Sequence, residues 1–146
     1  MRLKFLNSKV LFLYFLLSTF YILTSNSVSA DFLNQTSVFN VNPDYEYLGR
    51  TKVGATLRKV SDKAYWYVSD DYWAGISEPE RNLFLQKLEE LALEFDNRIY
   101  PLQTQFWGSE ANPGIDNDPK VTVFITKLID QAGGYFDSAH LYRRNQ

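Results

Sequence analysis

Apolar residues recur at steps of three and four positions between residues 77 and 100, which is the spacing of one face of a helix. The start of this segment is Ser77-Glu78-Pro79-Glu80, in which the serine and the second glutamate can bond the free amides of a first helical turn. The pattern predicts an amphipathic helix of about five turns that ends before Pro101. Its core-facing residues would be Phe84, Leu88, Leu91, Ala92, Phe95 and Ile99.

Three short runs are typical of strands. Residues 55–60 and 64–69 are β-friendly and are joined by the polar residues 61–63, which predicts a β-hairpin. Residues 121–126, Val-Thr-Val-Phe-Ile-Thr, follow a cluster of turn formers and predict a buried strand. The order of strand, helix and strand favours an α+β or α/β fold, in which the helix at 77–100 packs on a sheet containing residues 121–126.

Two segments have weaker patterns. Residues 31–50 mix polar and aromatic residues without a sustained period, and we interpret them as a linker or an extended lead-in. Residues 132–137, Ala-Gly-Gly-Tyr-Phe-Asp, predict a short edge strand after a flexible bend. The domain boundaries that follow are 31–50 for the lead-in and 51–146 for an incomplete domain.

The first thirty residues have the order of a cleavable signal peptide. Three basic residues precede an uncharged apolar run from Val10 to Leu23, and a small-residue stretch ends at Ala30, where we place the cut. Fourteen helical residues would extend about 21 Å, less than the roughly 30 Å of a membrane core. An uncleaved signal anchor is the alternative, but we expect an exported protein with no stable membrane span after cleavage.

The composition narrows the classes of function. Without residues 1–30 the chain holds 12 lysines and arginines against 17 aspartates and glutamates, a net charge of about −5 with no basic block. This balance gives no electrostatic reason to expect nucleic-acid binding. The chain has no cysteine, so the exported domain would be held together by its core rather than by disulfides.

Catalytic motifs are missing from the sequence. There is no thiol nucleophile, no His-Glu-x-x-His, no Gly-x-Ser-x-Gly and no glycine-rich phosphate loop. The single histidine, His140, cannot form the usual zinc set alone, and we interpret it as structural or incidental rather than as a ligand. No catalytic residue is therefore predicted on this chain.

Two other segments offer weaker binding chemistry. Asp116, Asn117 and Asp118, with Glu110 nearby, supply hard oxygen ligands in a turn, so a calcium site is possible here, although such turns also occur without metal. Gly133 and Gly134 precede Tyr135 and Phe136. This group either allows an extended peptide to approach a sheet edge or forms a tight bend with an aromatic anchor in the core.

Several blocks between about residues 95 and 142 resemble the segment before the zinc helix of secreted metallopeptidases of the hyicolysin and immune inhibitor A type. The blocks occur in the family's order and cover about a third of the chain. They are Phe95-Asp96-Asn97-Arg98-Ile99-Tyr100-Pro101, Phe106-Trp107-Gly108-Ser109-Glu110, Pro113-Gly114-Ile115-Asp116-Asn117-Asp118-Pro119-Lys120-Val121-Thr122-Val123 and Gly133-Gly134-Tyr135-Phe136.

The resemblance implies the N-terminal part of a zincin-like domain, a twisted sheet with one long packing helix. In the full-length parent, a following helix with His-Glu-x-x-His would bind zinc and activate a water to cleave a peptide or protein substrate. Residues 133–136 would then lie at the edge of the substrate cleft. The present chain carries none of the zinc ligands and would be inactive alone.

The leading prediction is therefore the N-terminal fragment of an exported zinc-dependent endopeptidase. One alternative is a small exported, non-catalytic module that binds a peptide or a protein through its aromatic-rich sheet. A degenerate remnant with no activity is a third possibility.

Overall fold

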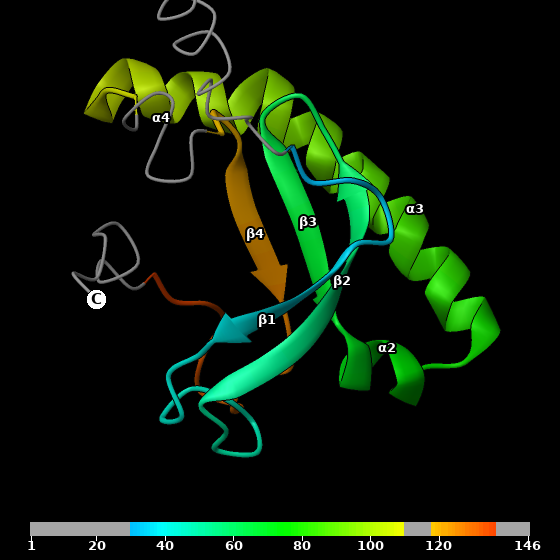
Figure 1. The fold of residues 1–146 in the computed structure, drawn as a ribbon. Helices are drawn as coiled ribbons and strands as arrows, with labels where there is room; N and C mark the ends of the chain where they lie inside the picture. The colour runs from blue at the N-terminus through cyan, green and yellow to red at the C-terminus, as the bar shows by residue number, and fades with distance from the viewer. Residues whose placement is uncertain (1–29, 110–117, 137–146) are drawn as a thin grey trace, which may run out of the picture.

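Four strands form one mixed sheet that carries a long helical segment on one face (Figure 1). The computed structural model describes residues 30–109 and 118–136. The strands are β1 (Thr36–Asn40), β2 (Lys52–Val60), β3 (Ala64–Ser69) and β4 (Val121–Ile125), in the order β1-β2-β3-β4. The first three are antiparallel neighbours, whereas β4 is parallel to β3. The architecture is α+β, and the predicted hairpin is confirmed. The predicted strand at 121–126 is confirmed as a strand, but it was expected to be buried, and β4, last in the strand order, is only half-buried.

Strand β3 forms the centre of the fold. All six of its residues are buried, because it has a strand on each side and a packed layer on each face. Ala64 and Trp66 face the helical layer, whereas Tyr65 and Tyr67 face the opposite side. A strand that is buried on both faces has a nearly continuous run of apolar residues, which is what residues 64–68 provide.

The chain leaves β3 through the short helix α2 (Asp70–Gly75) and enters α3 (Glu78–Glu94). The predicted start of α3 is confirmed, because Ser77 and Glu80 form a capping box in which the Ser77 amide donates to the Glu80 carboxylate at 2.7 Å. Leu88 and Ala92 are buried against Ala64 and Trp66 of β3. Leu91, predicted from the sequence to face the core, is 44% exposed.

The prediction that the helix ends before Pro101 is wrong. Residues Phe95–Ile99 form a π-helical turn, and α4 (Tyr100–Trp107) continues from it. The amide of Tyr100 bonds the carbonyl of Phe95, five residues earlier. This wider turn places Pro101 in the first turn of α4, a position where the missing N–H of proline costs little.

The sheet curls so that its first and last strands meet through their side chains. Phe39 of β1 stacks on Phe124 of β4, with ring centroids 4.7 Å apart, and contacts Tyr67 edge-on at 4.9 Å. Figure 1 shows β1 crossing in front of β4. The face opposite α3 is thus covered by the sheet's own first strand.

Two weak sequence interpretations need correction. Residues 31–50 are not only a lead-in, because residues 36–40 form strand β1. This strand is short and half-exposed, and it is stabilised by its pairing with β2. Residues 132–136 form no strand, so the predicted edge strand is wrong there, and Asp137 lies outside the described ranges. Residues 1–29, which carry the predicted signal peptide, also lie outside them. A search of the described residues finds no helix with the length and apolar character of a membrane span.

Asp96, in the π-helical turn, holds the hairpin onto the helix. Its carboxylate accepts hydrogen bonds from the amides of Asp62 and Lys63, at 2.8 and 3.1 Å, and from the Ser61 hydroxyl at 3.0 Å. Trp66 donates its indole N–H to the same hydroxyl at 3.1 Å. The tip of the hairpin is therefore bonded to a residue more than thirty positions away.

We expect Asp96→Ala to lower the free energy of unfolding by about 2 kcal/mol, because it leaves two turn amides without their charged acceptor. Urea denaturation of the variant measures this loss. Gln86→Ala, at an exposed position of α3, is the matched control and should unfold at the original midpoint. Equal midpoints for the two variants would contradict the anchoring role of Asp96.

Candidate functional site

A hollow of about 390 Å³ lies at the carboxyl ends of the parallel strands β3 and β4. Ser69 at the end of β3 lines it, together with residues of α2 that include Asp71. Thr126 and Lys127 line it from the end of β4, and Glu46, Tyr47, Leu48 and Arg50 line it from the loop after β1. Where parallel strands carry a helix on one face, ligands commonly bind beyond the carboxyl ends of the strands. This position makes the hollow the best candidate site in the described part of the chain.

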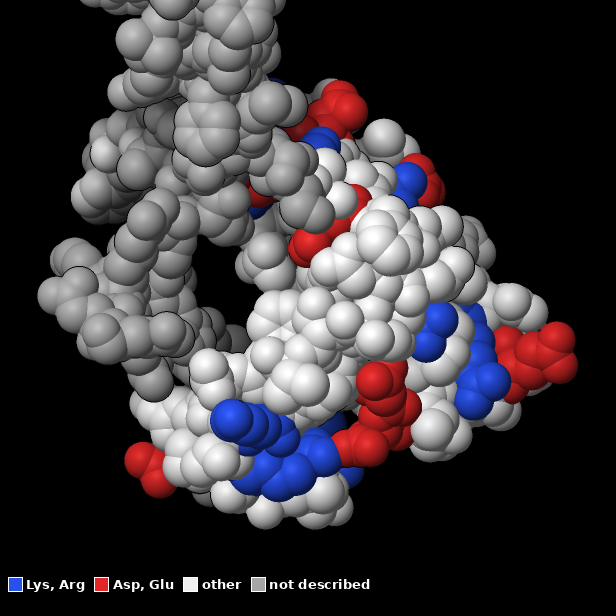
Figure 2. Space-filling view, in the orientation of Figure 1, with Lys and Arg blue, Asp and Glu red and all other residues white. Residues whose placement is uncertain are grey.

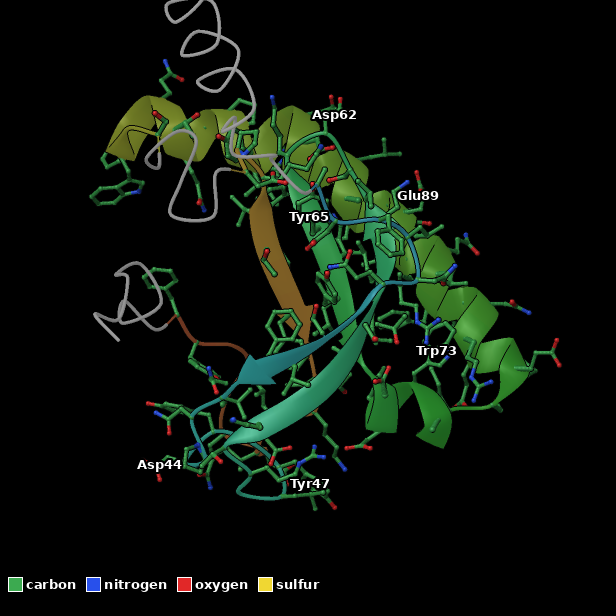
Figure 3. All side chains as sticks on the ribbon, in the orientation of Figure 1. Asp44, Tyr47, Asp62, Tyr65, Trp73 and Glu89 are labelled. Atoms are coloured by element: carbon green, nitrogen blue, oxygen red, sulfur yellow. The ribbon has the colours of Figure 1, made fainter. Side chains whose placement is uncertain are left out.

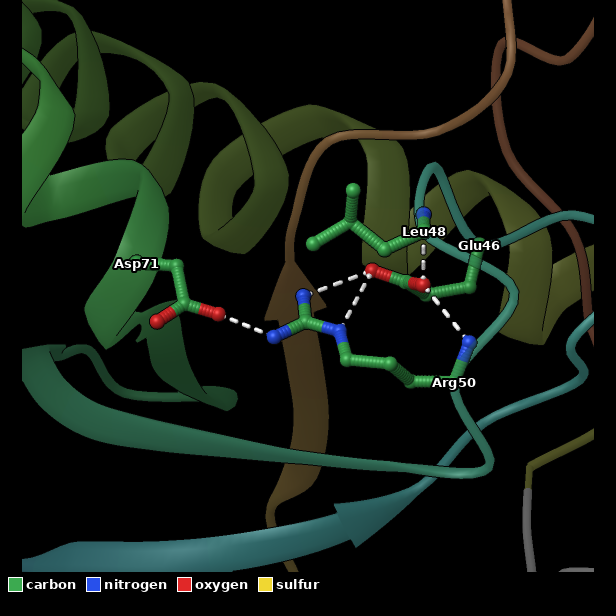
Figure 4. Close-up of polar contacts among 4 residues, drawn as sticks. All are labelled: Glu46, Leu48, Arg50 and Asp71. Carbon is green, nitrogen blue, oxygen red and sulfur yellow. Dashed lines mark hydrogen bonds and ion pairs between the residues drawn. The ribbon is translucent and has the colours of Figure 1, made fainter.

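The loop beside the hollow is built around a buried carboxylate. Glu46 is 2% exposed, and its carboxylate accepts hydrogen bonds from the amides of Leu48 and Arg50 at 2.8 and 2.9 Å (Figure 4). The Arg50 guanidinium donates to the same carboxylate from Nη2 at 2.6 Å and from Nε at 3.1 Å. Gly49 adopts a left-handed φ of 68°, which allows the chain to turn tightly around the carboxylate.

Arg50 also pairs with Asp71 of α2. One guanidinium thus connects the loop at 46–50 to the helix that follows β3. The loop is joined to the segment after β4 as well, because Glu46 and Leu128 form an isolated bridge and the Ile129 amide bonds the carbonyl of Tyr45 at 3.1 Å.

The electrostatics of Glu46 do not suit acid–base chemistry. The hydrogen bonds from the Arg50 side chain lower the pKa of Glu46, against the opposing effect of burial. A carboxylate that stays ionised and has four donors is a poor proton shuttle. Lys127 lies 3.7 Å from the ring centroid of Tyr47 at the rim. Among the described residues, no three acidic or histidine side chains are grouped as metal ligands.

The glycine-aromatic group predicted from the sequence lies outside this hollow. Tyr135 stacks on Tyr45 at 5.0 Å, and its hydroxyl accepts a hydrogen bond from the Asn42 amide at 3.0 Å. Phe136 is 75% exposed, and a Cβ atom added at Gly133 or Gly134 would meet no neighbour within 4 Å. Tyr135 is therefore an anchor on the loop at 42–45, at the surface rather than in the core.

The calcium candidates are only partly within the described residues. Asp118 accepts hydrogen bonds from the Tyr65 hydroxyl at 2.7 Å and from the Lys120 amide at 2.9 Å. Burial, reinforced by the bond to Asp118, raises the pKa of Tyr65 to about 12, so the hydroxyl remains a donor. Asp116, Asn117, Glu110 and His140 lie outside the described ranges.

Sequence reasoning did not find Glu46 and Arg50. The sequence does contain a pattern that could have indicated them, Glu46-Tyr-Leu-Gly-Arg50. An acid and an arginine four residues apart, with a glycine between them, can form an ion pair across a turn. The apolar residues of this segment follow no period, which favours a linker when the sequence alone is considered. A carboxylate whose partners are amides in its own loop leaves no trace in such a pattern.

Comparison with known proteins does not assign the site. No family model matches the chain, and no curated protein is significantly similar to it. The resemblance to secreted metallopeptidases therefore rests on the sequence blocks given above.

We expect the stability of the protein to fall in acid through Glu46. Because the folded state lowers this pKa, the stabilisation is complete above the unfolded-state value of about 4.3 and is lost as the pH falls through the folded-state value. Glu46→Gln should therefore lower the free energy of unfolding by about 2 kcal/mol at pH 7 and by less at pH 3. Urea denaturation across this range measures both values.

Asp44→Asn, an exposed change in the same loop, is the control for that experiment and should preserve the stability at pH 7. A Glu46→Gln deficit of the same size at pH 7 and pH 3 would show that the loss does not come from the ionised carboxylate.

Calcium binding at residues 116–118 predicts a higher melting temperature in millimolar calcium. Asp118→Asn should reduce the shift, because it removes one of the anionic oxygens. Differential scanning fluorimetry with and without calcium measures it, with Asp130→Asn as a control. An unchanged melting temperature in calcium would contradict calcium binding at these residues.

Proposed function

We propose that this chain is the N-terminal part of an exported zinc-dependent endopeptidase and that it is inactive without the sequence that supplies the zinc ligands. The observation that carries the proposal is the arrangement of the resembling blocks. They include the π-helical turn Phe95–Ile99 and strand β4, which belong to a helix-and-sheet unit of the kind the resemblance implies.

Exposed apolar residues support an incomplete domain. Helices α3 and α4 carry large apolar side chains away from the sheet, which are Leu83 at 57%, Leu93 at 54%, Leu102 at 54%, Phe106 at 77% and Trp107 at 81% exposure. Burying such side chains away from water would stabilise a domain. In the proposed parent, further elements of the same domain would cover them.

The residues of this chain do not fit a zinc centre. The sequence has one histidine and no cysteine, and the described residues contain no group of three potential ligands. Zinc would therefore be held by residues of the parent that follow this segment, with two histidines as ligands and a glutamate that activates the bound water. The present residues would provide the sheet, its packing helix and one side of the cleft.

A non-catalytic exported binding module is the second candidate. It is favoured by the hollow at the ends of β3 and β4, whose described lining residues include ion pairs but no nucleophile next to a base. On this proposal the hollow, rather than a zinc cleft, would hold the partner.

Sequencing the source DNA beyond the codon for Gln146 separates the two candidates. We expect an in-frame continuation that encodes His-Glu-x-x-His, and the extended protein should hydrolyse a protein substrate in a zinc-dependent manner. The control is the extended protein with alanine in place of the motif's glutamate, which should bind zinc but lose at least about 10³-fold in rate. A stop codon directly after Gln146 would refute the peptidase proposal.

A further inference from the structure

Strand β2 contains a bulge that changes the direction of one arginine side chain. Leu57 pairs with Tyr67 and Lys59 pairs with Trp66, so Arg58 is an extra residue without a partner in β3. A bulge of this kind bends the strand locally and redirects the inserted side chain. Arg58 is directed towards Trp73 of α2, with its guanidinium carbon 4.4 Å from the indole centroid.

A second arginine reaches the same indole from α3. The guanidinium carbon of Arg81 lies 5.5 Å from the centroid of Trp73, and its Nε donates to the Trp73 carbonyl at 3.0 Å. Figure 3 labels Trp73 at the junction of α2 and α3, and Figure 2 shows basic side chains gathered over this junction. We call Arg58 and Arg81 the arginine pair.

The arginine pair has no ion-pair partner among the described residues, unlike Arg50, Lys59, Lys87 and Arg98. The Nε of Arg58 is buried without a hydrogen-bond acceptor. The acid whose charge acts on Arg58 is Asp70, which makes no ion pair with it and accepts a hydrogen bond from the Thr56 hydroxyl at 2.6 Å.

Two positive charges that share one aromatic ring repel each other. Burial lowers the pKa of Arg58, and the charge of Arg81 acts in the same direction, whereas Asp70 opposes both. The contacts with Trp73 hold the two guanidiniums in place without neutralising them. An anion bound to the two guanidiniums would reduce the repulsion and add charge-assisted hydrogen bonds.

We propose that the arginine pair and Trp73 form a binding site for a carboxylate group. A planar carboxylate matches the geometry of a guanidinium donor fork. The negative charge of Asp70, which acts on Arg58, favours a monoanion over a phosphate dianion. The carboxylate can belong to a free organic acid or to an acidic side chain of a peptide. The proposal does not depend on peptidase activity.

The test is a titration of the purified, ¹⁵N-labelled chain, followed through the arginine Nε–Hε signals by NMR. The probes are the α-amide of N-acetylglutamate, which carries one carboxylate, a capped short peptide with a single glutamate, the same peptide with glutamine, and inorganic phosphate, all at constant ionic strength. We expect saturable shifts of the Arg58 and Arg81 signals with both glutamate probes. The Arg50 signal, which belongs to an existing ion pair, should stay in place.

Variants establish that the arginine pair is responsible. Arg58→Met and Arg81→Met should each weaken binding at least about ten-fold, the effect of losing a charge-assisted hydrogen bond. Lys87→Met, which removes an exposed charge from the same helix, should leave affinity unchanged. Circular dichroism shows whether each variant folds. If Arg58→Met does not fold, the test uses Arg81→Met and the charge-preserving Arg58→Lys instead.

Several outcomes would overturn the proposal. Shifts that do not saturate, or that sodium chloride reproduces, would indicate screening alone. Tighter binding of phosphate than of the N-acetylglutamate amide would refute the assignment to carboxylates.

Two outcomes would support the proposal and identify the source of the carboxylate. Binding of the peptide but not of the N-acetylglutamate amide would identify an acidic peptide, whereas comparable binding of both would identify the carboxylate itself as the feature recognised.

Discussion

The burial of β3 on both faces is the constraint on which the other described elements depend. Its six residues have strands on both sides, α3 on one face and the curled edge of the sheet on the other. The two large polar side chains on this strand, Tyr65 and Tyr67, each bond a carboxylate, Asp118 and Asp31 respectively. A buried tyrosine hydroxyl needs a hydrogen-bond partner. The two hydroxyls therefore hold Asp118 and Asp31, which are remote in sequence, against the core.

Local patterns predicted the elements that are stabilised locally. The capping box at Ser77 needs only neighbouring residues, and it was recognised from the sequence. The hairpin was recognised from its polar turn at residues 61–63, although Asp96 also bonds that turn. The continuation of the helix through Pro101 depends on a π-helical turn, whose extra residue no apolar period reveals. Strand β1 was missed because a half-exposed strand of five residues has a weak pattern, and its pairing with β2 supplies the order.

The candidate sites were harder to predict because charges do not follow a period. Glu46 and Arg50 were present in the sequence as an ordinary polar pair, and only their burial against loop amides gives them a structural role. The arginine pair is assembled from a strand bulge and a helix that are more than twenty positions apart. Conversely, the glycines at 133 and 134 suggested a close backbone approach, but they lie in open space.

The curl of the sheet bears on the order in which the protein can fold. Strands β1, β2 and β3 form a meander of local pairings, whereas Ala64 pairs with Val121 across the whole helical segment. Contacts between distant positions form late, because a long loop must first close. Strand β4 is therefore expected to dock last, and the stacking of Phe124 on Phe39 would complete the process. Until then the free edge of β3 is exposed, and such an edge is a template for pairing with another chain.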